Sequence, residues 1–387
     1  MRRYDIVAAI FGFTLLAGCG SSSPSIGSSD AADADKAQVG PLGFTPSNID
    51  LAKLDFKGIG DIDCTATGGI STSSTPGTLG CSEQTQRNFT VVTQSDGTKL
   101  GVWVARSWRI EPNVTLGLDG DEGADFPLVL VATETIDILG GLDGVPNGNG
   151  AVGGGFRGSS TGSGGGPGGG GAAGSNNAGG GGSYCGVGGT GGAEKGAANA
   201  PGGSSYGTAK LVPLTGGSSG GGDELCAGAG GGAIQLVAGV SVTIGAGASV
   251  NVGGGGGSFG SCGGGSGGAL LIESPSVTVD GALAANGGAG GSCGNSGGNG
   301  LPSAKPAAGG SSTQSGPTVV GGSGSAGATT QGGDGQASTN PEFSCTAGGG
   351  GGAGRIRINT SAGKASVAGA SLSPGDATPC LTQGTLP

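Results

Sequence analysis

Residues 233–251 have the sequence Ala-Ile-Gln-Leu-Val-Ala-Gly-Val-Ser-Val-Thr-Ile-Gly-Ala-Gly-Ala-Ser-Val-Asn, and this stretch decides the fold class. It contains three short runs rich in β-branched residues, in which apolar and polar positions alternate, with glycine-containing turns between them. Alternation with a period of two places one face of each run in a core. The pattern therefore predicts short β-strands and leaves little room for helix.

The pattern recurs in residues 127–144 and 269–286, and more weakly in residues 355–372. A strand of about four residues cannot bury its face alone, so the copies are expected to stack and share a ladder of hydrogen bonds. The sequence thus predicts an all-β fold, a right-handed parallel β-helix-like solenoid with long glycine-rich loop insertions. A β-sandwich built from the same strands, with disordered glycine loops, is the alternative. The side chains expected to point into the core are Ile234, Leu236, Val242, Ile244, Leu270, Ile272, Val277 and Val279.

Glycine accounts for 100 of the 387 residues, and most glycines lie in three insertions at about 141–232, 253–268 and 287–354. The absence of a strict Gly-x-y period with proline excludes collagen. Two alternatives stay open for these insertions. They are either disordered, or they pack as extended polyglycine-II helices, since no side chain keeps neighbouring chains apart.

The N-terminal residues 2–19, Arg-Arg-Tyr-Asp-Ile-Val-Ala-Ala-Ile-Phe-Gly-Phe-Thr-Leu-Leu-Ala-Gly-Cys, have the pattern of a bacterial lipoprotein leader. A basic start precedes an apolar run that is shorter than the roughly 20 residues of a membrane-spanning helix. Leu16-Ala-Gly-Cys19 resembles a lipobox, so Cys19 is expected to be lipidated and to become the first residue. Gly20 follows it in place of the aspartate of inner-membrane retention. We therefore expect an outer-membrane location, with the chain anchored by lipid and exposed at the surface.

The expected organisation is a signal peptide over 1–18, a lipidated flexible tether over 19–45, an N-terminal cap region over 46–87, and the solenoid over 88–380. The serine- and glycine-rich residues after Cys19 are typical of a tether.

Eight cysteines remain after Cys19, and an even number in an exported chain predicts disulfides. They are Cys64, Cys81, Cys185, Cys226, Cys262, Cys293, Cys345 and Cys380. Sequential pairing is expected, because a flexible loop is easiest to close near its start. The predicted bonds are 64–81, 185–226, 262–293 and 345–380.

The composition argues against several classes of function. The net charge is −10, so no basic face is expected for nucleic acid. Histidine is absent, which removes the commonest general base and a favoured zinc ligand. No cofactor, no catalytic residue and no metal site is therefore predicted. Minor alternatives are weak calcium binding in the acidic stretch 119–125 and chemistry at the adjacent acids Asp223 and Glu224.

The chain resembles a family of uncharacterised glycine-rich lipoproteins common in myxobacteria and their relatives. The resemblance is carried by residues 92–110, 127–132, 267–279 and 352–359, and it extends from about Phe44 onward. Members are often labelled as similar to mycobacterial PE-PGRS proteins, but a PE domain is missing here. The resemblance supports the fold and the location and transfers no catalytic residue.

These observations favour a non-catalytic cell-envelope surface lipoprotein with a structural or adhesive role. Its expected partners are the membrane, through the lipid anchor, and polysaccharide or extracellular matrix. A carbohydrate-active enzyme (a polysaccharide lyase or hydrolase) and an ice- or crystal-surface-binding protein are the alternatives.

Overall fold

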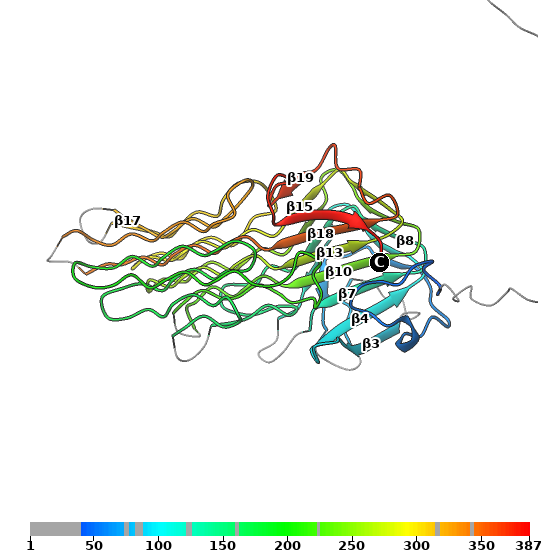
Figure 1. Cartoon of the computed structure of the whole chain (residues 1–387), viewed down its shortest axis with the longest axis horizontal. Coiled ribbons are helices and arrows are strands. Elements are labelled where there is room, and N and C mark those ends of the chain that lie inside the picture. Colours follow the sequence, from blue (N-terminus) through cyan, green and yellow to red (C-terminus); the bar gives the residue numbers. More distant parts are fainter. Residues whose placement is uncertain are drawn as a thin grey trace, which may run out of the picture. The chain divides into compact units, whose positions relative to one another are not determined.

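The computed structural model describes residues 40–72, 77–81, 88–120, 126–158, 162–222, 225–313, 318–340 and 344–387. The chain divides into two units, Met1–Gln38 and Val39–Pro387. The first unit lies outside the described residues, and so do the predicted signal peptide and Cys19. No helix in the described ranges is both long and apolar enough to span a membrane. Every element below belongs to the second unit (Figure 1).

The largest sheet has seven strands in the order β20-β18-β13-β10-β7-β4-β3. All neighbours in it are parallel except β3, which is antiparallel to β4 at one edge. In the order of the chain its strands are β3 (Asn88–Thr93), β4 (Lys99–Ala105), β7 (Leu128–Ala132), β10 (Ala233–Ala238), β13 (Ala269–Glu273), β18 (Arg355–Thr360) and β20 (Leu381–Thr385).

Two further sheets are wholly parallel. The five-stranded sheet has the order β1-β5-β8-β11-β14, and the six-stranded sheet has the order β19-β15-β12-β9-β6-β2. The five-stranded sheet consists of β1 (Ile62–Cys64), β5 (Trp108–Ile110), β8 (Thr135–Ile138), β11 (Ser241–Ile244) and β14 (Ser276–Val279). The six-stranded sheet consists of β2 (Gly68–Ile70), β6 (Thr115–Leu118), β9 (Gly141–Asp143), β12 (Ser249–Asn251), β15 (Ala282–Ala284) and β19 (Ser371–Ser373).

Short elements complete the described part of the chain. A 3-10 helix, η1 (Leu51–Lys53), is capped by the side chain of Asp50, which accepts from the backbone N–H of Ala52. The strands β16 (Ser311–Ser312) and β17 (Val319–Val320) form a separate antiparallel pair.

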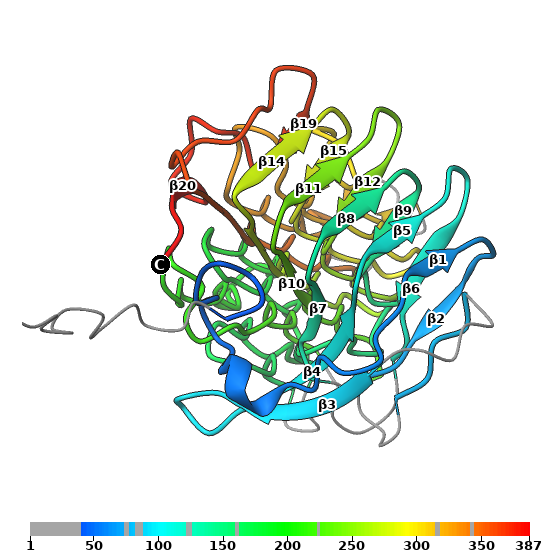
Figure 2. The same cartoon turned by 90° about the vertical axis from the view of Figure 1, so that its right-hand side faces the viewer.

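The strand register brings equivalent positions of the sequence copies together. Ile234 pairs with Leu128 on one side and with Leu270 on the other. From β4 to β15, each pass of the chain therefore adds one strand to each of the three sheets, as Figure 2 shows for β5, β8 and β11 of the five-stranded sheet. The eight side chains predicted to point inward are all buried in one apolar core between the sheets, which confirms that part of the prediction.

A second core covers the outer face of the seven-stranded sheet. Leu42, Ile49 and Leu54 of the N-terminal segment 42–56 pack there against alternate side chains of the central strands. The central strands β7, β10 and β13 are consequently buried on both faces. This explains why their sequences are nearly continuous apolar runs.

The glycine-rich segments 144–232, 252–268 and 285–354, here called the glycine bundle, are hydrogen-bonded to one another through the backbone. The Gly221 N–H donates to Gly180 O at 2.7 Å within the first segment, and the Gly263 N–H of the second segment donates to Gly221 O at 2.8 Å, so stretches distant in sequence lie side by side (Figure 1). A Cβ on Gly180 would lie 1.9 Å from the carbonyl oxygen of Pro201. Only glycine permits an approach this close.

The predicted fold class is wrong and is corrected as follows. A regular solenoid over 88–380 requires each pass to repeat the same parallel strands, whereas the seven-stranded sheet is mixed and the passes are not all alike. The strand β3 reverses direction, β16 and β17 pair apart from the large sheets, and the five-stranded sheet ends at β14 while the others continue. The alternative of a sandwich with disordered loops also fails, because the described glycine segments are hydrogen-bonded. In its described residues the chain is all-β, with three mostly parallel sheets and a glycine bundle.

We predict that Gly180→Ala destabilises the protein by about 1–3 kcal/mol, the usual cost of forcing an added methyl group into a packed interior. Gly298→Ala is the matched control in the same bundle, because its Cβ would meet no atom closer than 3.6 Å. Urea unfolding followed by circular dichroism measures both. Equal midpoints for the two variants would contradict the close-packed description.

Candidate functional site

All eight cysteines of the second unit form disulfides. The bonds are Cys64–Cys81, Cys185–Cys380, Cys226–Cys262 and Cys293–Cys345, with Cα–Cα distances of 4.8, 5.6, 5.8 and 5.7 Å. The eight candidates are therefore confirmed as disulfide residues. The first predicted pairing is confirmed, and the predicted bonds 185–226, 262–293 and 345–380 are wrong.

The error has a physical cause in the glycine bundle. Sequential pairing assumes that each cysteine bonds its next neighbour in the chain, but the bundle places stretches that are distant in sequence side by side. The Ser258 N–H of the second segment donates to Cys226 O of the first at 2.8 Å, next to the bond that joins Cys226 to Cys262. Backbone packing in the bundle, and not proximity in sequence, therefore selects the partners.

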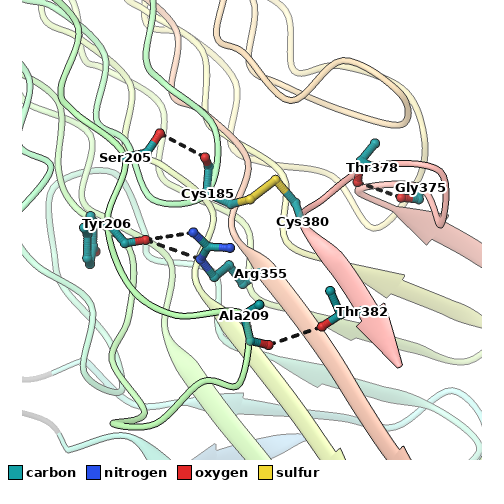
Figure 3. Close-up of a disulfide and its surroundings, with 9 residues drawn as sticks. All are labelled: Cys185, Ser205, Tyr206, Ala209, Arg355, Gly375, Thr378, Cys380 and Thr382. Atoms are coloured by element: carbon teal, nitrogen blue, oxygen red, sulfur yellow. Dashed lines mark hydrogen bonds between the residues drawn. A yellow bond between two sulfur atoms is a disulfide. The ribbon is translucent and has the colours of Figure 1, made fainter. Parts of the chain in front are cut away.

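The bond between Cys185 and Cys380 joins the glycine bundle to the start of β20 (Figure 3). It connects residues 195 positions apart. Beside it, the Thr382 Oγ1 donates to Ala209 O at 3.2 Å, and the Arg355 Nη2 donates to Tyr206 O at 3.0 Å. This junction holds the last two strands of the seven-stranded sheet against the bundle.

Two stacked tyrosines lie behind the junction. The ring centroids of Tyr184 and Tyr206 are 4.6 Å apart, and the Arg355 guanidinium lies 5.7 Å from the centre of the Tyr184 ring. Burial raises the pKa of both tyrosines, and it lowers the pKa of Arg355. Tyr206 therefore stays a neutral phenol, whose hydroxyl donates to Gly216 O at 2.6 Å. The cluster is a packing anchor made of an aromatic stack and a cation.

A buried carboxylate fixes the N-terminal segment on the sheet. Glu273 is fully buried, and its Oε2 accepts from the backbone N–H of Ser47 at 2.9 Å and from Gln235 Nε2 at 2.8 Å. Its Oε1 accepts from Ser47 Oγ at 2.6 Å and from Asn359 Nδ2 at 3.0 Å. Asn48 extends the network by donating to Gln235 Oε1 at 3.3 Å. The Glu273 carboxylate thus accepts four hydrogen bonds, and these compensate its burial without a direct ion pair to a described residue.

This polar network around Glu273 was not predicted from the sequence. A signal was present, because Gln235 and Glu273 interrupt strands that are otherwise apolar on both faces. A polar residue at such a position must be hydrogen-bonded when the strand is buried on both sides. The partner Ser47 could not be found, since it lies 226 residues away in sequence.

Several surface cavities are lined by described residues. One, of about 700 Å³, includes Glu194, Lys195 and Ser344 in the glycine bundle. A second, of about 530 Å³, includes Phe89 and Trp103, whose ring centroids are 4.9 Å apart. The third, of about 320 Å³, lies at the turns between the five- and six-stranded sheets. In the first of them Ser344 Oγ donates a hydrogen bond to Glu194 Oε1, so a hydroxyl and a carboxylate meet there directly, with no histidine between them.

The described residues contain no cluster of three or more histidine, cysteine, aspartate or glutamate side chains that could hold a metal ion. Most of the acidic stretch considered for calcium, together with Asp223 and Glu224, lies outside the described residues.

No protein-family model, no curated protein and no solved structure matches the chain in the comparisons with known proteins.

We predict that Cys185→Ser combined with Cys380→Ser lowers the free energy of unfolding by about 3–5 kcal/mol, because this bond closes a very long loop. Limited proteolysis should then cut first near β20. The double variant of Cys64 and Cys81, whose bond spans 17 residues, is the control and should leave β20 protected. The same first cleavage site in the wild type and in the 185/380 variant would rule out the anchoring role.

We predict that Glu273→Gln destabilises the protein by about 3 kcal/mol, because an amide NH₂ in either orientation faces two donors that then lack an acceptor. Hydrogen exchange should accelerate in residues 42–56. The control is Glu134→Gln, since Glu134 is exposed on the surface. Unchanged exchange in residues 42–56 would show that Glu273 does not hold the segment.

Proposed function

We propose that the protein is a non-catalytic lipoprotein of the cell envelope, anchored through Cys19, with a structural or adhesive role toward polysaccharide or extracellular matrix. The observation that carries the proposal is the set of four disulfides. Disulfides persist in oxidising compartments outside the cytoplasm, so eight fully paired cysteines support export. The leader-like residues 2–19 support the same location independently.

The construction of the described unit supports a mechanical role. Its glycine bundle is held by backbone hydrogen bonds and by disulfides within and between its segments. These bonds depend on neither a bound group nor a charged surface, and charged residues make up only 11% of the chain. A unit of this kind resists unfolding outside the cell, where chaperones and reducing agents do not maintain it.

Catalysis is not part of the proposed function because the sequence lacks the commonest catalytic base. Histidine is absent, so a serine or cysteine nucleophile would need another base. The cysteines of the described unit are all oxidised to disulfides and are not free nucleophiles.

We predict that Cys19→Ala abolishes incorporation of a labelled fatty acid and moves the protein from the membrane fraction to the soluble fraction. Ser21→Ala is the control and should be acylated as the wild type is. Protease treatment of intact cells should degrade the wild-type chain while a periplasmic marker survives. Acylation of the Cys19→Ala chain would exclude the anchor, and protection of the wild type from protease would exclude surface exposure.

A further inference from the structure

The outer face of the five-stranded sheet carries a continuous row of polar side chains. The row crosses all five strands in register and consists of Asp63, Arg109, Asp137, Thr243 and Thr278. Each of these side chains is partly exposed. With neighbouring strands about 4.8 Å apart, the row is about 19 Å long.

A second, shorter row lies two residues away along the strands. It consists of Thr135, Ser241 and Ser276, which pair in the same register. The two rows are about 6.6 Å apart, because a strand rises about 3.3 Å per residue. The serine and threonine hydroxyl groups of the two rows make no hydrogen bond to other described residues, so they are available to bind a ligand.

The charge on this face is acidic. Arg109 donates from Nε to Glu111 Oε1 at 2.6 Å, and the negative charges of Glu111, Asp137 and Asp63 together raise its pKa. Three carboxylates thus surround one guanidinium. At the edge of the sheet Arg106 pairs with Asp61 and lowers the pKa of that carboxyl to about 2, so this pair adds no net charge.

The two rows contain only serine, threonine, aspartate and arginine. Protein interfaces have an apolar core in which aromatic residues are enriched, and these rows offer nothing from which to build one. None of the three cavities described above has a residue of these rows in its lining, so the face suits an extended polymer better than a small ligand that must be enclosed. A linear polymer that presents hydroxyl groups and positive charges complements both the hydroxyl groups of the two rows and the negative charge of the face.

We infer that the outer face of the five-stranded sheet binds a linear polysaccharide that carries free amino groups, such as a glucosamine polymer. The ammonium groups pair with Asp63 and Asp137, and the sugar hydroxyls exchange hydrogen bonds with the serine and threonine rows. This inference deepens the proposed function, on which it rests, by naming the class of polysaccharide and the surface that meets it.

The test is binding of the full chain, extracted in a non-ionic detergent, to immobilised chitosan. The wild type should be retained at physiological salt. The double variant D63N/D137N should bind at least tenfold more weakly, because both carboxylates point to solvent and their loss removes the attraction without disturbing the core. The control D55N/D376N changes the same net charge at exposed positions off this face and should bind within twofold of the wild type.

Added positive charge keeps the test informative if the neutralised variant is unstable. Thr243→Lys with Thr278→Lys introduces two cations at partly exposed positions of the long row and should abolish retention while urea unfolding stays unchanged. Equal weakening by the on-face and off-face aspartate pairs would mean attraction by net charge alone and would overturn the inference.

Two other polymers identify the ligand class. Equal retention on fully N-acetylated chitin would overturn the role of the amino groups, and equal retention on polylysine would favour a basic protein in place of a polysaccharide. These outcomes leave the proposed function standing. Acylation and protease treatment test that function separately, so the two can fail independently.

Discussion

The structure depends on how closely peptide backbones can approach when side chains are absent. Within the glycine bundle many carbonyl oxygens occupy the place that a neighbouring Cβ would take, as at Gly221, where a Cβ would lie 1.7 Å from Gly171 O. Backbone N–H and C=O groups of these segments find partners on other passes of the same segment and on other segments. Hydrogen bonding between passes of the chain thus replaces an apolar core as the source of order in this half of the unit.

The sheets and the bundle support each other through a few specific contacts. The glycine segments begin at the ends of β9, β12 and β15 and return into β10, β13 and β18, so the strand register sets the spacing at which the segments enter the bundle. Arg355 and the two stacked tyrosines close the contact on one side. Glu273 fixes the N-terminal segment over the sheet on its outer face. A small number of polar anchors therefore orients large areas of packing that are not directional.

Part of this arrangement could be predicted from the sequence. The alternation in residues 233–251 placed Ile234, Leu236, Val242 and Ile244 in the core, because period-two patterning reports directly on which face is buried. The overall fold class was predicted incorrectly, since local repeats contain no information about the reversed strand β3 or about the order at the sheet edges. Three disulfides were mispaired for a related reason. Glycine has no side chain to show which segment is its neighbour, so the partner of Cys185 cannot be recognised from residues near it.

The candidate site likewise contains residues that could be predicted from the sequence and residues that could not. The cysteines were identified by count and compartment alone, whereas the Glu273 network required contacts across more than two hundred residues. The polar rows on the five-stranded sheet were predictable in part. Their members were visible as the polar half of each alternating strand, but only the register shows that Asp63, Arg109 and Asp137 are neighbours.

The bond between Cys185 and Cys380 also has a consequence for the order in which the molecule is made. Cys380 follows all three glycine-rich segments in the chain, whereas Cys185 lies within the first. If the chain is exported from its N-terminus, as we propose, Cys185 stays a free thiol until about two hundred further residues have crossed the membrane. During that interval Cys226 and Cys262 arrive first and are competing partners. Correct pairing then requires either that the bundle assembles before oxidation or that a disulfide isomerase corrects the early bonds.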